Sequence, residues 1–238
     1  MTRHELAARL ARRLRPPGTR ASDALHAALA PFATPEAVRD LLCGTLRDEQ
    51  WLDAVRDASY RHDNGFDKIV LMAGAGYQFR LHVWREVPRE AEVENVHNHR
   101  WDFSSVILLG GYRFQEFTPD PGGCPFHAYG YVSERGSASY SLEALGQRGL
   151  TRSFDAHLRA GTSYTLTSDV LHRVSNPPGR LTMSLVLQGP HQPDSAVLVY
   201  AEKRLPSGRT LPRAGFSHED LRHLLGDLVD ELADPLAV

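Results

Sequence analysis

Three histidines in two short patterns constrain the fold of this chain most strongly. His97 and His99 flank a single residue, and His172 follows much later in the sequence. Alternate residues of a β-strand point to the same side, so the first two imidazoles would share one face. A third imidazole on a facing strand would complete a three-histidine metal site. The patterns therefore predict a metal site inside a β-barrel and favour an enzyme.

Composition places the chain among ordinary soluble proteins. Its 238 residues are 42% hydrophobic and 24% charged, as expected for one large domain or a domain with appendages. A net charge of −2 argues against general nucleic-acid binding, and no apolar run is long enough to span a membrane. Cys43 and Cys124 are too few for a disulfide framework, so we expect free thiols in a cytoplasmic protein.

Helical patterns occupy the start of the chain. Leucines recur at helical spacing from residue 2, and the pattern continues to residue 58 with breaks between helices. Ser22 is the expected N-cap of a helix that ends at Leu29. Thr34 and the following proline predict the start of another helix, and Asp48–Ala58 predicts a further one.

The central part of the chain reads as strands separated by glycine and proline turns, which is typical of a sandwich or barrel. The expected strands are Lys68–Ala73, Tyr77–Glu86, Ser104–Leu109, Tyr112–Glu116, Ala128–Glu134, Ser137–Ala144, Thr151–Leu158, Ser163–Leu166, His172–Ser175, Leu181–Leu187 and Ala196–Tyr200. Ser217 then caps a last predicted helix that ends near Ala233. These patterns divide the chain into a helical annex (1–62), a β-barrel (63–202) and a loop with a C-terminal helix (203–238).

The two histidine patterns resemble the two sequence motifs of the cupin superfamily. The first motif places a glycine before the His-x-His pair and another after it; here Ala91 replaces the first glycine, and Gly110 closes the motif. The second motif begins at Gly161, contains His172 and ends at Asn176, with Thr167 and Asp169 in place of its usual proline and glycine. The resemblance implies a double-stranded β-helix (a jelly-roll barrel) with N-terminal helices and a short C-terminal helix.

The cupin resemblance also implies a metal, but with one ligand missing. Many cupins add a glutamate to the three histidines, and the corresponding position here holds Phe103 or Ser104. Asp102 is a nearby carboxylate, although its offset differs from that of the usual glutamate. Three imidazoles suit Fe, Zn, Cu or Ni, so the ligand types alone leave the metal open.

Among cupins with three histidines, residues 60–190 look most like the cysteine dioxygenase group. The run Leu171–Asn176 is close to that family's Leu-His-Arg-Val-Glu-Asn, and Gly74-Ala75-Gly76 precedes a strand that ends at Trp84, as in that family. The resemblance implies Fe(II) as the metal and O₂ as a co-substrate. It also places Lys68 where the family has a carboxylate-binding arginine.

Other residues of that family are replaced. Ser104 stands at the cysteine of the family's Cys–Tyr crosslink. The family's Ser-x-His-x-Tyr element corresponds to Ser184, Val186 and Gln188, so that only the serine is retained. We therefore expect a similar metal platform with a rebuilt substrate pocket, whose substrate need not be a thiol.

Strand alternation predicts which side chains fill that pocket. Arg80 and His82 share a face with Trp84, so all three would point into the barrel if Trp84 does. Lys68 and Arg80 would hold a substrate carboxylate, and His82 would act as a general base. Alternatively, Arg80 lies at the rim and His82 is a structural polar group. Further candidates for substrate contact are Trp101, Ser104, Tyr164 and Gln188, and for Trp101 and Tyr164 the alternative is packing.

The leading hypothesis is a mononuclear non-haem Fe(II) oxygenase with His97, His99 and His172 as ligands and a small, amino-acid-like carboxylate as substrate. A redox-neutral metal enzyme (an isomerase, lyase or decarboxylase) is a second hypothesis. A non-catalytic ligand-binding cupin is a third. We expect a monomer or a homodimer, with no nucleic-acid or membrane partner.

Overall fold

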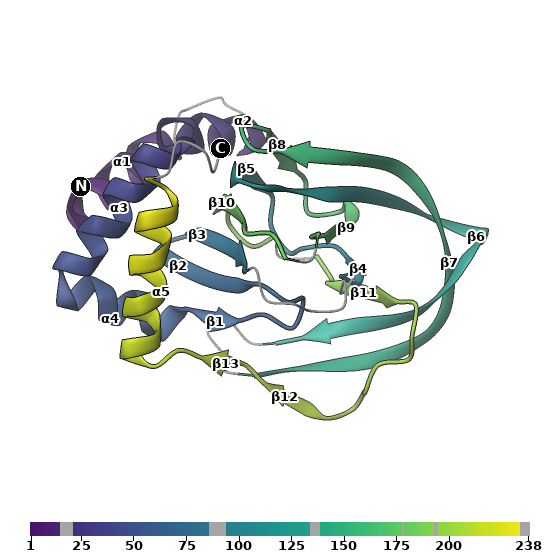
Figure 1. Ribbon diagram of the computed structural model, residues 1–238. Helices are drawn as coiled ribbons and strands as arrows, with labels where there is room; N and C mark the ends of the chain where they lie inside the picture. Colours follow the sequence, from purple (N-terminus) through teal and green to yellow (C-terminus); the bar gives the residue numbers. More distant parts are fainter. Residues whose placement is uncertain (15–20, 86–93, 134–138, 178, 193–194, 234–238) are drawn as a thin grey trace.

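The computed structural model describes residues 1–14, 21–85, 94–133, 139–177, 179–192 and 195–233. Within these residues the helices are α1 (Arg3–Arg13), α2 (Ala21–Leu29), the 3₁₀ turn η1 (Ala30–Phe32), α3 (Pro35–Arg47), α4 (Glu49–Ala58) and α5 (His218–Glu231). Figure 1 shows them gathered on one side of a β-structure. None of the described helices is long and apolar enough to cross a membrane.

The described strands are β1 (Tyr60–Arg61), β2 (Asp67–Gly74), β3 (Tyr77–Trp84), β4 (Val96–His97), β5 (Phe103–Leu109), β6 (Gly111–Val132), β7 (Ser139–Arg159), β8 (Ser163–Leu166), β9 (Leu171–Ser175), β10 (Thr182–Gln188), β11 (Leu198–Ala201), β12 (Thr210–Pro212) and β13 (Ala214–Gly215). They form two antiparallel sheets. Sheet A has the order β13-β1-β2-β3-β10-β5-β8, and sheet B has the order β11-β4-β9-β6-β7-β12. The fold is the expected double-stranded β-helix with helices at both ends of the chain.

Helix starts follow local capping chemistry. The side chains of Thr34, Asp48 and Ser217 accept hydrogen bonds from backbone N–H groups in the first turns of α3, α4 and α5, which satisfies donors that have no partner inside the helix. The predicted cap at Ser22 is wrong, because α2 already begins at Ala21. Ser22 therefore lies inside the first turn of α2.

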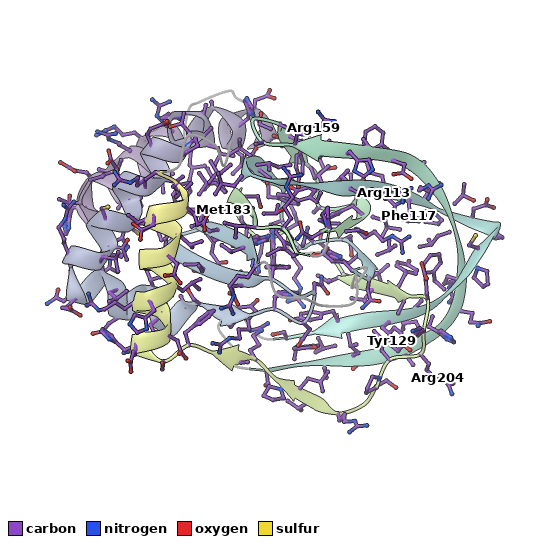
Figure 2. All side chains as sticks on the ribbon, viewed as in Figure 1. Arg113, Phe117, Tyr129, Arg159, Met183 and Arg204 are labelled. Carbon is purple, nitrogen blue, oxygen red and sulfur yellow. The ribbon has the colours of Figure 1, made fainter. Side chains whose placement is uncertain are left out.

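The helices cover the outer face of sheet A and share one hydrophobic core with it. Leu6 and Trp51 from the helices join Phe79 and Leu185 from the sheet in this core. Figure 2 shows Met183 of β10 on the side that faces the helices. Strand pairing in sheet A crosses both expected segment boundaries, since β1 precedes residue 63 and β13 follows residue 202.

The long strands β6 and β7 depart from the sequence expectation. Four shorter strands were expected over 112–158, whereas β6 and β7 each run through and bend together around the end of the molecule farthest from the helices (Figure 1). The Pro-Gly-Gly step is absorbed as an irregularity between Pro119 and Cys124, so the ladder resumes after it. Expected strand ends at Glu86, Glu134 and Ser137 lie outside the described residues.

Strand β5 separates the barrel interior from the helix-facing core. Phe103 and Ile107 belong to the cluster between the two sheets, whereas Val106 and Leu108 belong to the helix-side core. Because side chains alternate along a strand, Ser105 faces the barrel interior and Ser104 faces away from it. This parity decides which serine can reach a ligand inside the barrel.

Gly110, the closing glycine of the first motif, has a structural reason to be glycine. Its φ is +69°, and a Cβ there would lie 2.4 Å from the carbonyl oxygen of Leu181. Gly161 has a similar φ of +84°, but a Cβ there would meet no atom within 4 Å.

We expect Gly110→Ala to destabilise the protein more than Gly161→Ala. The second substitution carries only the conformational cost, about 1–2 kcal/mol. The first adds a collision with backbone that cannot move without disturbing β10. Chemical denaturation of both variants would measure the two costs, and equal losses would show that the collision at Gly110 is relieved freely.

Candidate metal centre

The three predicted histidines converge inside the barrel. His97 ends β4 and pairs directly with His172 of β9, and His99 follows two residues after His97. Their ligand nitrogens all lie within 4.8 Å of one another. The backbone N–H of His99 donates to the carbonyl of Ser168 at 3.2 Å, which fixes the segment beyond the end of β4. The set therefore comes from strand pairing together with one anchored loop.

Backbone carbonyls determine which nitrogens of two histidines are free. His97 Nδ1 lies 2.9 Å from the carbonyl oxygen of Asn95, and His172 Nδ1 lies 3.1 Å from that of Val170. A carbonyl oxygen only accepts, so Nδ1 carries the proton and Nε2 keeps its lone pair. This arrangement is usual for histidines that bind a metal through Nε2.

The protonation state also suits a metal. Burial lowers the pKa of all three imidazoles, and it lowers the pKa of His172 to about 3. Neutral imidazole is the form that coordinates. Three neutral nitrogens with free lone pairs fit a divalent metal of borderline softness.

Neither alternative ligand reaches the cluster. Asp102 Oδ1 accepts a hydrogen bond from the backbone N–H of Ser168 at 2.9 Å, so Asp102 holds the loop that carries His99. Ser104 Oγ lies 2.6 Å from Thr165 Oγ1 on the outer side of β5. Asp102 and Ser104 also do not line the cavity around the histidines. Asp102 is therefore not part of the histidine cluster, and Ser104 does not line the pocket in which it was expected.

A cavity of about 690 Å³ surrounds the histidine cluster. It is lined by all three histidines and by seven predicted pocket residues: Lys68, Arg80, His82, Trp84, Trp101, Tyr164 and Gln188. The volume lies within the usual range for small-molecule sites. The predicted roles of these seven residues stay predictions, but the fold brings them together around one space.

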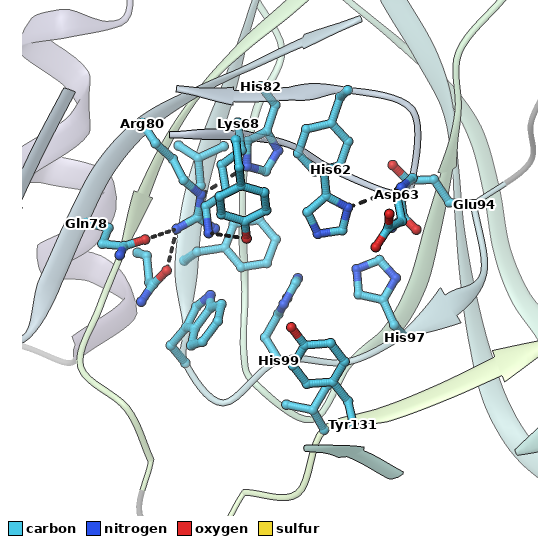
Figure 3. A pocket seen from close by; sticks show the side chains of 18 of the residues that line it. His62, Asp63, Lys68, Gln78, Arg80, His82, Glu94, His97, His99 and Tyr131 are labelled. Carbon is cyan, nitrogen blue, oxygen red and sulfur yellow. Dashed lines mark hydrogen bonds between the residues drawn. The ribbon is translucent and has the colours of Figure 1, made fainter. Parts of the chain in front are cut away.

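Arg80 is held rigidly in the wall of this cavity. It is 3% exposed, its Nε donates to His82 Nε2 at 2.9 Å, and its Nη1 donates to the side-chain oxygens of Gln188 and Gln78 (Figure 3). His82 in turn stacks on Phe66, with ring centroids 4.3 Å apart. Because His82 Nε2 accepts from Arg80, its proton sits on Nδ1 and its lone pair is engaged. In this arrangement His82 positions Arg80 and has no free lone pair for the expected role as a base.

Lys68 adds a second cation, which is partly buried. Its Nζ donates to the hydroxyl of Tyr60 at 3.2 Å. Burial and the nearby Arg80 charge lower the pKa of Lys68 well below its usual value, and burial lowers the pKa of Arg80 to about 10. Within the described residues, neither cation forms an ion pair with a carboxylate. The Trp101 ring lies 5.9 Å from the Arg80 guanidinium, and its buried indole N–H has no hydrogen-bond partner among the described residues.

Tyr164 has both a packing contact and a polar contact. Its ring lies 5.2 Å from that of Phe114, and its hydroxyl lies 2.8 Å from the hydroxyl of Tyr112. Burial raises the pKa of Tyr164 to about 12, so it stays a neutral phenol near neutral pH. The pair gives the barrel interior a hydroxyl cluster beside the histidines.

Several cavity residues were not anticipated. Tyr60 and His62 precede β2 and line the cavity next to Lys68, and their alternate spacing resembles that of Arg80 and His82. Ser105 lines the cavity in place of Ser104. Glu94 also lines the cavity, and no periodic pattern marked it because it lies before β4.

Comparison with solved structures finds cupins at low similarity. An RmlC-like cupin from Shewanella frigidimarina is 15% identical over 57% of this chain and 86% of that chain, with a TM-score of 0.33. A protein with a double-stranded β-helix domain from Klebsiella pneumoniae is 13% identical over 64% and 95%, with a TM-score of 0.33. Hydroquinone 1,2-dioxygenase is 14% identical over 53% and 64%, with a TM-score of 0.30.

Sequence comparison adds no assignment. No protein-family model matches the chain, and no curated protein matches it. Similarity at the level of the solved structures identifies neither a subgroup nor an activity. The resemblance to the cysteine dioxygenase group therefore stays a prediction.

Proposed function

We propose that this protein is a mononuclear non-haem Fe(II) oxygenase that acts on a small anionic substrate. One observation carries the proposal: a three-histidine cluster shares one cavity with the buried Arg80 and the partly buried Lys68, and neither cation has a carboxylate partner among the described residues. Such a cavity combines the ligands for a metal with a place for the negative group of a substrate. The resemblance of residues 60–190 to the cysteine dioxygenase group favours iron as the metal.

The three histidines and their backbone partners form a site for a metal ion. His97, His99 and His172 would hold it, and the carbonyls of Asn95 and Val170 keep two of the three rings oriented. Bound ferrous iron would supply the ability to activate O₂ for reaction with an organic substrate. Because the set contains no carboxylate, more coordination positions stay open than in a four-ligand cupin.

The two cations support an anionic substrate. A cation removed from water is costly unless an opposite charge replaces the lost solvation. Among the described residues, the hydrogen-bond partners of Lys68 and Arg80 are neutral: Tyr60, His82 and two glutamines. A carboxylate between them would gain charge-assisted hydrogen bonds, and the indole N–H of Trp101 offers a further donor.

A redox-neutral metal enzyme is the second candidate. The observation that favours it is the donor set, since three neutral imidazoles generally bind Zn²⁺ or Ni²⁺ more tightly than Fe²⁺. In that case the same cavity residues would bind and orient an anion, and O₂ would play no part. The test must therefore distinguish iron from zinc or nickel, and O₂-dependent oxidation from redox-neutral chemistry.

The test is purification without oxygen, followed by metal analysis, ferrous reconstitution and exposure to nitric oxide. We expect the paramagnetic resonance signal of a high-spin iron nitrosyl, and we expect this signal to disappear in His97→Ala. Glutarate and other carboxylates should change its shape by binding beside the iron. Protein that holds stoichiometric Zn or Ni and forms no nitrosyl would contradict the oxygenase and favour the redox-neutral enzyme.

A further inference from the structure

Glu94 is a buried carboxylate that the proposed chemistry does not use. Only 6% of it is exposed, and it lines the cavity just before β4. Its Oε2 accepts a long hydrogen bond of 3.3 Å from the backbone N–H of Val174. Its Oε1 is buried and has no hydrogen-bond partner in the described part of the chain. Glu94 therefore faces the cavity with an unsatisfied oxygen.

Glu94 requires a partner in order to be ionised. Burying an ionised carboxylate is costly unless a cation or several donors compensate for the lost water. Among the described residues, Glu94 has no ion pair, and burial raises its pKa to about 8. A positive group beside Glu94 would restore the ionised form. The missing partner can come from a ligand, because the cavity already reaches this side chain.

The cavity is polarised by charge. Figure 3 shows Arg80 and Lys68 on one side of it and Glu94 on the other, beside His97. Asp63 also lies on the Glu94 side, where it accepts a hydrogen bond from Tyr140. A ligand that spans the cavity would therefore meet Lys68 and Arg80 at one end and Glu94 at the other. Arg213 also lines the cavity, where it donates to the hydroxyl of Tyr131.

We infer that Glu94 binds the ammonium or guanidinium group of a substrate whose anionic group lies at Lys68 and Arg80. Lys68 and Arg80 lie on the opposite side of the cavity from Glu94, so a chain must separate the two charged groups of that substrate. This favours ω-amino carboxylates and related molecules over α-amino acids, whose two charged groups share one carbon. The inference rests on the proposed anion site and adds the chemical class of the rest of the substrate.

The test is calorimetric titration of the zinc-loaded and metal-free protein. The ligands are ω-amino carboxylates from 4-aminobutanoate to 8-aminooctanoate, unsubstituted alkanoates of equal length, and α-amino acids of equal length. We expect one ω-amino carboxylate to bind about tenfold or more tightly than its alkanoate, as a charge-assisted bond would give. Glu94→Gln should abolish this preference and leave alkanoate binding intact, whereas Glu143→Gln, at an exposed position, should change neither.

A second variant keeps the inference testable if Glu94→Gln folds poorly. Glu94→Asp withdraws the carboxylate by one methylene, so the preferred ω-amino carboxylate should become one carbon longer. If alkanoates and ω-amino carboxylates of equal length bind equally tightly, the role of Glu94 is overturned and the anion site stands. Loss of metal from folded Glu94→Gln would also overturn it, by placing Glu94 in the metal shell. Failure of every carboxylate to bind would instead overturn the proposed anion site.

Discussion

Replacing His172 with alanine is expected to abolish metal binding. His172 supplies one of the three neutral nitrogens of the cluster, and two imidazoles alone seldom hold a divalent ion against water. Loss of an outer partner of a metal ligand already lowers affinity about 10–100-fold, so loss of the ligand itself should cost at least about 100-fold. Calorimetric titration with Zn²⁺ or Co²⁺, together with metal analysis of purified protein, would measure the change.

The matched control is His157→Ala, because His157 lies on β7 and is exposed. That variant should bind metal as the unmodified protein does. His172 is buried, so near-ultraviolet circular dichroism must show that His172→Ala keeps its tertiary structure. A folded His172→Ala protein with unchanged affinity would mean that the three histidines are not the metal site.

The histidine cluster could be predicted from sequence because its geometry follows from local rules. The spacing of His97 and His99 and the later position of His172 resemble motifs whose strands are neighbours in the barrel. The pairing of His97 with His172 across β4 and β9 agrees with this expectation. Strand alternation likewise placed Arg80, His82 and Trp84 on one face, and all three line the cavity.

Strand parity could not be predicted where no polar–apolar alternation marks it. Every residue of β5 is buried, since one of its faces meets the helices and the other meets sheet B. The pattern of Phe103–Leu109 therefore does not show which serine points inward, and Ser104 was chosen by homology of position. β1 was missed because a strand of two residues carries no periodic signal. β4 ends at His97, so His99 lies beyond the strand that was expected to carry both histidines.

Polar networks were the least predictable part of the site. Alternation places Arg80 and His82 on one face, but it does not indicate that Arg80 bonds to His82 Nε2 and to Gln188, which is 108 residues away. These bonds depend on rotamers that only the folded barrel sets. Glu94 belongs to the same class, because its hydrogen-bond partner is the backbone N–H of Val174 in β9, 80 residues away.

Replacing Lys68 with methionine is expected to stabilise the protein and to abolish binding of carboxylates. Methionine preserves most of the volume of the lysine stem and removes a partly buried charge, whose hydrogen-bond partner within the described residues is a phenol. Replacement of buried charges by apolar groups is often stabilising by about 1–4 kcal/mol. In a chain of this size each kcal/mol raises Tm by about 2–4 °C. The exposed Lys203, changed to methionine, is the control and should alter neither property.

The gain from Lys68→Met should depend on pH in a defined direction. The pKa of Lys68 is lowered in the folded protein, so the unfolded chain binds more protons between the folded pKa and the unfolded value of about 10.4. Stability of the unmodified protein therefore rises with pH across that interval, and the advantage of the variant is largest below it. Denaturation at several pH values, with calorimetry using glutarate, would measure both effects. A variant that is less stable and still binds glutarate would show that Lys68 has a structural role. Greater stability together with lost binding would show that Lys68 binds the ligand at a cost to the stability of the fold.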